Sequence, residues 1–189
     1  MFDNSNVSDK QIITPKERVE GCELVLMSRD KDPKSASFRS VTFHFKETAT
    51  GAILDHREFA PNRVIGTKTL TNDEYKKNIS LTHSRIAHIT RAFLPEEKFK
   101  LIKVEGDLDA LLKAGNYTAI DAAWDAYITM TGQALGATGT GVEAAKGKAI
   151  ALKVIYRTVK TKNYASLPNI PPFISSELHP KPFSTNPQY

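Results

Sequence analysis

The chain has 189 residues but only one cysteine, one tryptophan and no long apolar run. An internal disulfide needs two cysteines, so the single Cys22 excludes one and fits a reducing compartment. No run approaches the roughly 18 to 20 apolar residues of a membrane-spanning helix, so we expect no membrane partner. The opening residues are polar and acidic, whereas a signal peptide begins basic and then turns apolar. We therefore expect a cytoplasmic location.

Acidic residues are missing from one long stretch near the C-terminus, residues 144–176, which we call the basic window. It contains no Asp or Glu, and its cations are Lys146, Lys148, Lys153, Arg157, Lys160 and Lys162. The net charge of the basic window is +6, whereas that of the whole chain is +5. The excess positive charge thus lies in one segment, which favours a polyanion or an acidic protein as the partner.

Hydrophobic periodicity predicts strands first, then helices, then strands again. The early strands are expected at 22–30, 38–47 and 52–59. The helices are expected at about 71–94, 95–99, 107–115 and 118–136. Strand period returns at 148–159, and a proline-rich edge strand or extended wrap follows at 163–174. A capping box formed by Thr71 and Glu74 starts the first helix, and Gly115 and Gly136 close the last two.

This element order is that of an OB-fold, a five-stranded Greek-key barrel with a helix between its third and fourth strands. We therefore predict an α+β fold, an OB-like antiparallel barrel with a helical insertion at about 71–136. The domain is expected to span 21–177, after a flexible arm at 1–20 and before a proline-rich tail at 178–189. Other α+β folds share the same element order.

Alternation in the strand at 148–159 divides its side chains between two faces. The face expected to pack on the core carries Ile150, Leu152, Val154 and Tyr156. Lys153 and Arg157 share the other face, about 13 Å apart by strand rise, which matches about two nucleotides of backbone. This face is therefore the predicted path of a nucleic-acid strand.

We predict that five cations of the basic window neutralise phosphates: Lys148, Lys153, Arg157, Lys160 and Lys162. The candidate stacking rings are Tyr164, Phe173, Phe38 and His44, and Arg57 is a further candidate contact. The alternative interpretation is a solvated basic surface whose rings belong to the core. The first long helix is a secondary candidate surface through Lys76, Lys77, Arg85, His88 and Arg91, although a solvated helix face explains the same residues.

Enzyme signatures fail when their spacing is examined. The segment Gly141–Ala149 resembles a phosphate-binding loop, but Val142 stands where the first glycine is needed, and Ala149 stands where Ser or Thr would hold magnesium. The sequence "DHRE" (Asp55–Glu58) has metal-ligating side chains, but a strand turns neighbouring residues to opposite faces. We expect no enzymatic activity, no cofactor and no metal; a metal-dependent nuclease using "DHRE" is the enzyme alternative.

Two segments carry a resemblance to a known family. The sequences "AHITRAFLPEEKF" (87–99) and "LKVIYRTVKTKNYASLPNIPPFI" (152–174) resemble single-stranded DNA-binding proteins encoded by tailed bacteriophages, which are OB-fold proteins with helical insertions. The resemblance runs from about Cys22 to Ser175. It implies sequence-independent binding of single-stranded DNA during viral replication or recombination, in the cytoplasm of a bacterial host and without catalysis.

The tail departs from that family. Many of its members end in an acidic tail that recruits replication proteins, whereas the residues after Glu177 include Lys181 and no acid. From the sequence we expect a binder of single-stranded DNA, or of RNA, with replication or transcription proteins as further partners. The alternative is a phage protein-interaction module, a transcription cofactor or virion-associated protein, that uses the basic strand on an acidic partner.

Overall fold

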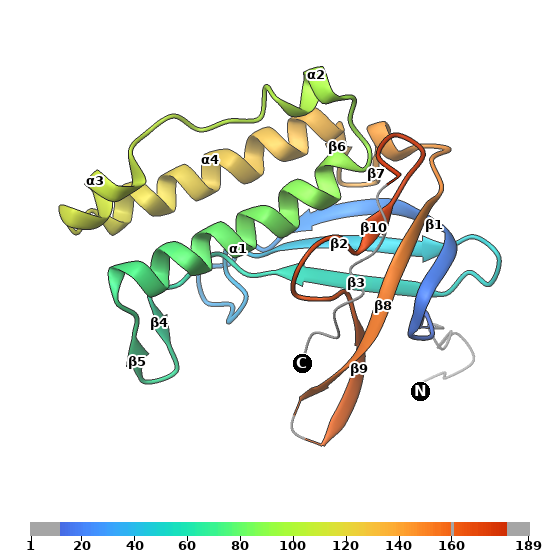
Figure 1. The fold of residues 1–189 in the computed structure, drawn as a ribbon, viewed down its shortest axis with the longest axis horizontal. Coiled ribbons are helices and arrows are strands. Elements are labelled where there is room, and N and C mark those ends of the chain that lie inside the picture. The colour runs from blue at the N-terminus through green and yellow to red at the C-terminus, as the bar shows by residue number, and fades with distance from the viewer. Residues whose placement is uncertain (1–11, 160, 181–189) are drawn as a thin grey trace, which may run out of the picture.

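The structure, a computed structural model, describes residues 12–159 and 161–180. Its main element is an antiparallel sheet in the order β10-β8-β1-β2-β3, with β9 paired to β8. The strands of this sheet are β1 (Lys16–Arg29), β2 (Val41–Glu47), β3 (Ile53–Glu58), β8 (Ile150–Val159), β9 (Lys162–Ser166) and β10 (Ile174–Ser175). Figure 1 shows β1, β2 and β3 side by side, with β8 crossing beside β1.

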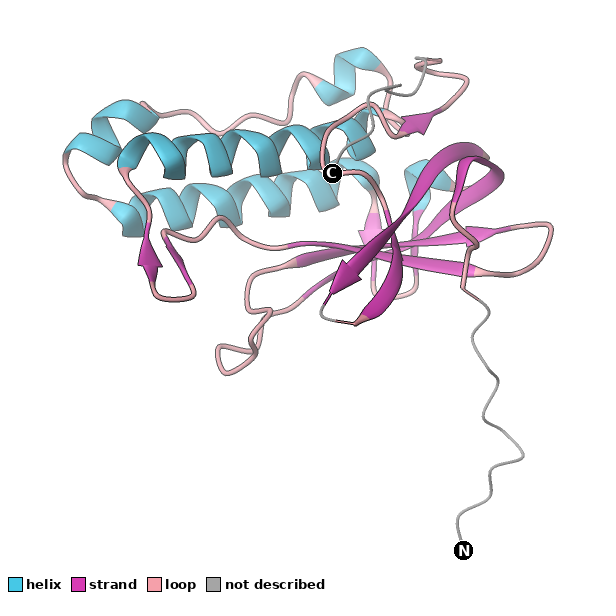
Figure 2. Ribbon diagram, turned by 60° about the horizontal axis from the view of Figure 1, so that its bottom comes forward, coloured by secondary structure: helices cyan, strands magenta, loops and turns pink. Residues whose placement is uncertain are grey.

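The middle of the chain is helical, as predicted. Its helices are α1 (Asn72–Arg91), α2 (Glu96–Phe99), α3 (Leu108–Lys113) and α4 (Tyr117–Leu135). The two long helices, α1 and α4, lie side by side on one side of the sheet (Figures 1 and 2). Short pieces flank them: β4 (Val64–Ile65), β5 (Lys68–Thr69), β6 (Ala137–Thr138), β7 (Gly141–Val142) and the 3-10 turn Glu143–Ala145.

Local sequence sets where the long helices begin and end. The Thr71 side chain accepts from the Glu74 N–H, and the Glu74 carboxylate accepts from the Thr71 N–H, so the predicted capping box is confirmed. Gly136 closes α4 in the left-handed conformation at φ 62°, which is also as predicted. Because these signals act within one helical turn, they can be recognised in the sequence without knowledge of the fold.

The core lies between the sheet and the second halves of the long helices. Its largest fully buried side chains are Phe43, Phe45, Phe93, Phe173, Ile13, Ile86, Ile89, Ile128, Leu94, Leu135, Leu152 and Leu167. A second, smaller cluster joins Leu70, Tyr75, Leu112 and Ile120 at the other end of the helices. Cys22 is fully buried in the main core, where burial, with Glu47 and Glu20 nearby, raises the pKa of its thiol to about 12.

The mixed α+β class is confirmed, and the sheet is antiparallel and open. Within the described part of the chain, β3 and β9 form no ladder of backbone hydrogen bonds with each other. The prediction that the arm extends to residue 20 is wrong, because β1 already begins at Lys16 and Ile13 is buried. The expected last strand is divided into β9 and β10, separated by the proline-containing segment 167–173. Residues 1–11 and 181–189 lie outside the described residues.

Candidate nucleic-acid interface

Strand β8 changes its surroundings along its length. Its first half is flanked by β1 and β10 and is buried on both faces from Ile150 to Val154. Its second half pairs with β9 alone, and this β8–β9 hairpin projects from the rest of the molecule (Figures 1 and 2). The residues from Tyr156 to Val159 are therefore exposed on both faces.

The exposed hairpin carries rings and cations without acids. Tyr156 has 64% of its surface exposed and Tyr164 has 50%. Arg157 and Tyr164 are cross-strand partners, so their side chains share one face, and Lys162 lies on the same face two residues away. Tyr156 points to the opposite face. The hairpin thus offers stacking surfaces and positive charge within a few residues of each other.

A cleft separates the hairpin from β3, and we call it the β3–β9 cleft. Its volume is about 470 Å³, and it is lined by Ile12, Ile13, Thr14, Pro15, Ile53, Leu54, Asp55, Tyr156, Asn163, Tyr164 and Ala165. Both exposed tyrosines of the hairpin border this cleft. An unstacked base has an apolar face, so a cleft walled by tyrosine, isoleucine and proline is suited to receive one.

The outer face of β2 and β3 continues from the cleft. His44 is held by both ring nitrogens: Nδ1 contacts Asp55 Oδ1 at 2.7 Å and Nε2 contacts Ser28 Oγ at 2.8 Å. Arg57 is exposed, and its Nε donates to Thr42 Oγ1 at 3.2 Å. Lys46 is exposed on the same face. This face offers two cations, but the carboxylate of Asp55 lies between them in register.

Two of the predicted contacts, Phe173 and Lys153, are wrong as solvent-facing groups, and a third, Lys148, is engaged by the backbone. Phe173 is fully buried, its ring 4.8 Å from that of His88, so it is a core residue and no base can stack on it. Lys153 is 6% exposed, and its Nζ lies 2.8 Å from Glu17 Oε2, so it does not line an open phosphate path. The Nζ of Lys148 donates to the carbonyl of Phe93 at 2.8 Å, where it satisfies the chain just beyond the end of α1.

The assignment of faces along β8 also needs correction. Tyr156 was expected in the core and is exposed, whereas Lys153 was expected outside and is buried. Near Lys153, β8 lies between β1 and β10, and the Lys153 ammonium is paired with Glu17 of β1. The core ends before Tyr156. Lys160 lies outside the described residues.

The secondary candidates on α1 are mostly engaged in structural contacts. Arg85 pairs with Glu58, and Arg91 pairs with Glu96 at 2.8 Å. His88 Nε2 accepts from the backbone N–H groups of Phe173 and Ile174 at 3.1 and 3.0 Å. These contacts tie α1 to neighbouring segments, so this helix face is not an open basic surface.

Phe38 lies in the loop between β1 and β2 and is 41% exposed. The next residue, Arg39, fixes this loop to α4 through Asp121 at 2.9 Å and Asp125 at 3.0 Å. Burial alone would lower the pKa of Arg39, but both carboxylates outweigh it, so the net pKa is raised. Phe38 is therefore an accessible ring on an anchored loop.

A polar pocket lies at the other end of β3, and we call it the Glu58 pocket. Its volume is about 390 Å³, and its lining residues are Asp55, His56, Arg57, Glu58, Phe59, Ala60, Asn62, Ile65, Asn78, Thr82, Arg85, Arg157, Ser166 and Asn169. The "DHRE" segment thus lines this pocket. Its Glu58 binds Arg85 and His56. Residues 12–159 and 161–180 contain no group of three or more His, Cys, Asp or Glu side chains placed to hold a metal ion.

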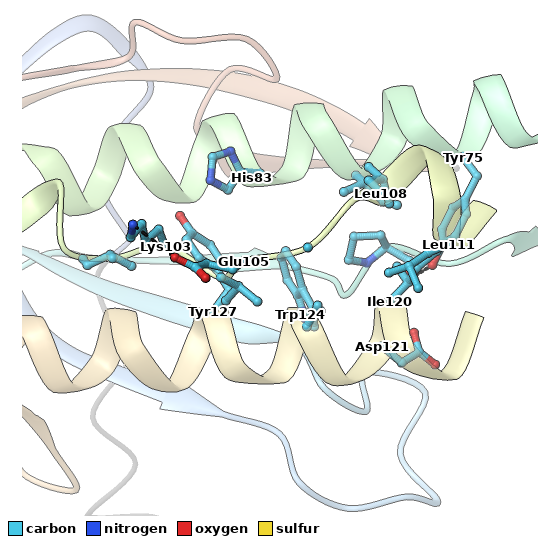
Figure 3. Close-up of a pocket in the computed structure, with 16 residues that line it drawn as sticks. Tyr75, His83, Lys103, Glu105, Leu108, Leu111, Ile120, Asp121, Trp124 and Tyr127 are labelled. Carbon is cyan, nitrogen blue, oxygen red and sulfur yellow. Dashed lines mark hydrogen bonds and ion pairs between the residues drawn. The ribbon is translucent and has the colours of Figure 1, made fainter. Parts of the chain in front are cut away.

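An apolar cavity of about 440 Å³ lies between α1, α4 and the segment 102–106 that crosses over them. Figure 3 shows His83 of α1 facing Trp124 and Tyr127 of α4 across it. The rings of His83 and Tyr127 lie 4.8 Å apart, and burial raises the pKa of Tyr127 to about 12 and lowers that of His83. This cavity belongs to the helical layer, whereas the hairpin projects from the sheet (Figure 1).

Comparison of the chain with protein-family models, curated protein sequences and solved structures finds no match. Within residues 12–159 and 161–180, every helix is too short or too polar to cross a membrane.

Sequence reasoning missed three residues of the candidate surface: Tyr156, Phe59 and Asn169. Tyr156 was assigned to the core by alternation. Phe59 follows directly after β3 and is 56% exposed, and Asn169 lies in the loop after β9, where its Oδ1 accepts from Arg157. For Asn169 the sequence offered one signal, the run of turn-forming residues around it. Such a run predicts a loop, but it does not predict that the loop lies beside β3.

Proposed function

We propose that this protein binds single-stranded DNA, with little dependence on base sequence, through the β8–β9 hairpin and the outer face of β2 and β3. The observation that carries the proposal is the hairpin, which exposes Tyr164 with Arg157 and Lys162 on one face and Tyr156 on the other. Rings accept any base by stacking, and cations neutralise phosphates whatever the sequence. A duplex keeps its bases stacked, so rings of this kind favour single strands.

The strand pairing supports the same proposal. The order β3-β2-β1-β8-β9 matches that of a five-stranded OB-type barrel that is left open between β3 and β9. In OB-folds, oligonucleotides bind on strands two and three and on the loops after strands one and four. The corresponding parts of this chain are β2, β3, the loop that carries Phe38, and the tip of the β8–β9 hairpin. We propose an OB-type barrel on this basis.

The proposed setting is viral DNA replication or recombination, which the resemblance to phage single-stranded DNA-binding proteins favours. The proposed role is to cover single strands without cleaving them. RNA shares the phosphates and the stacking faces that this surface would use, so a labelled RNA strand belongs in the same measurement.

The direct test substitutes the two hairpin tyrosines. Tyr156→Ala and Tyr164→Ala should each weaken binding of a 30-nucleotide oligo-dT by about 5- to 150-fold, because a stacked base contributes ~1–3 kcal/mol. Both rings are exposed, so the melting temperature should change little. The matched control is Leu101→Ala, which removes another exposed apolar side chain from the segment after α2.

Unchanged affinity in both tyrosine variants would refute stacking on the hairpin. Wild-type protein that binds no oligonucleotide but retains an acidic replication or transcription protein would instead support the protein-interaction module.

A further inference from the structure

The Glu58 pocket is a built polar site that the hairpin proposal does not use. Three segments distant in sequence meet there: the end of β3, the middle of α1 and the chain around β9. Its volume, about 390 Å³, is at the small end of the range of about 300–1,000 Å³ typical of ligand sites. The pocket is thus suited to one nucleoside.

The floor of the pocket is rigid and already paired. Arg85 donates to both oxygens of the Glu58 carboxylate, at 2.6 and 2.5 Å, and His56 Nε2 lies 2.8 Å from the same carboxylate. Arg85 also reaches the carbonyl of Asn169 at 3.5 Å, so the floor positions the loop that forms one wall. A ligand entering this pocket meets a preorganised surface, which lowers the entropic cost of binding.

The walls of the pocket carry several hydrogen-bond donors. The Oδ1 of Asn169 accepts from Arg157, and the Oδ1 of Asn62 accepts from the N–H of Val64 at 2.9 Å. Each of these amides has its NH₂ group left to donate. Arg57 and Arg157 add guanidinium donors, and one carboxylate oxygen of Asp55, Oδ1, is engaged by His44. A donor-rich pocket prefers a base with keto oxygens.

The mouth of the pocket suits the rest of a nucleotide. Phe59 and Ile65 line it and are 56% and 55% exposed, so they offer apolar surface to the ring of a base. Arg57 and Arg157 are both exposed and line the same pocket, where they can neutralise the adjoining phosphate. Arg157 also links the pocket to the hairpin, on which it is the cross-strand partner of Tyr164.

We propose that the Glu58 pocket holds one base of the bound strand and favours keto bases, thymine or guanine, over the amino bases cytosine and adenine. The inference rests on the proposed function, because the base belongs to a strand already held by the hairpin. Thymine and cytosine are the sharpest pair: they are similar in size, but thymine carries an acceptor where cytosine carries an amino donor.

The test is the ratio of affinities for oligo-dT and oligo-dC of 30 nucleotides, measured by fluorescence anisotropy. Wild-type protein should bind oligo-dT about five- to tenfold more tightly, as expected for one discriminating contact. Asn169→Asp replaces the NH₂ donor by an acceptor while its carboxylate still accepts from Arg157, so the ratio should fall to about one or below. Asn78→Phe adds a ring to the pocket from α1 without changing charge and should also abolish the preference.

Thr161→Asp is the matched control, because it places the same negative charge at the hairpin tip, outside the pocket. It should weaken both oligonucleotides equally and leave the ratio unchanged. Equal wild-type affinity for the two oligonucleotides, or a preference that survives in both pocket variants, overturns the base site while the hairpin proposal stands. Failure to bind either oligonucleotide overturns both.

Discussion

Glu58 places a carboxylate in the protein interior, with only 2% of the residue exposed, beside His56 and Arg85. Burial alone would raise the pKa of Glu58, but hydrogen bonds from His56 and Arg85 and their positive charge outweigh it, so the pKa is lowered. Because Glu58 ends β3 and Arg85 belongs to α1, this single pair connects the sheet to the helical layer.

A lowered folded-state pKa means that Glu58 stabilises the fold above its unfolded-state pKa of about 4.3, and that this stabilisation is lost as the pH falls towards the folded-state pKa. Glu58→Gln should therefore reduce the free energy of unfolding at pH 7 by about 3–5 kcal/mol, since it leaves the half-buried Arg85 without its charge partner. Urea unfolding at pH 7, 5 and 3 measures the difference in free energy of unfolding between wild type and variant. This difference should become smaller only below about pH 5.

Glu97→Gln, on the exposed side of α2, serves as the control and should change stability little at any pH. If the difference in free energy of unfolding between wild type and Glu58→Gln stays constant down to pH 3, the Glu58 carboxylate does not hold its charge in this pair.

At the scale of elements, the end of α4 depends on one glycine. Gly136 has φ 62°, and a Cβ at this position would lie 2.8 Å from the Cβ of Glu143. Gly136→Ala should reduce the free energy of unfolding by about 1–3 kcal/mol, from left-handed strain and the close contact together. Gly139→Ala is the control, because Gly139 has no positive φ and a Cβ there meets nothing within 4 Å.

Equal melting temperatures for these two alanine variants would contradict the account of how α4 ends. The expected result is a clear drop in melting temperature for Gly136→Ala alone.

The elements themselves were largely predictable because their signals are local. The capping box of Thr71 and Glu74, the closing Gly136 and the alternation of β2 all act over a few residues. The site was less predictable because burial depends on distant segments. Lys153 pairs with Glu17, and Phe173 packs on His88 from α1, contacts that no short window of sequence contains.

At the scale of the whole molecule, only part of the positive charge of the basic window reaches the exposed hairpin. Lys146 pairs with Glu143 at 2.5 Å, Lys148 bonds the chain after α1, and Lys153 is buried. Arg157 and Lys162 remain on the exposed hairpin, and Arg57 and Lys46 join them from the sheet. The interface therefore combines cations from two distant parts of the chain, of which Arg57 and Arg157 both line the Glu58 pocket.

The central claim is that this combined surface binds single strands, and the most direct measurement is fluorescence anisotropy with 30-nucleotide oligo-dT and a duplex of equal length across a salt series. We predict much tighter binding of oligo-dT, with log K falling against log salt with a slope of about −2 to −3, as for ~3–4 neutralised phosphates. Equal and weak binding of single strand and duplex would contradict the account and leave the hairpin as a basic surface for a protein partner.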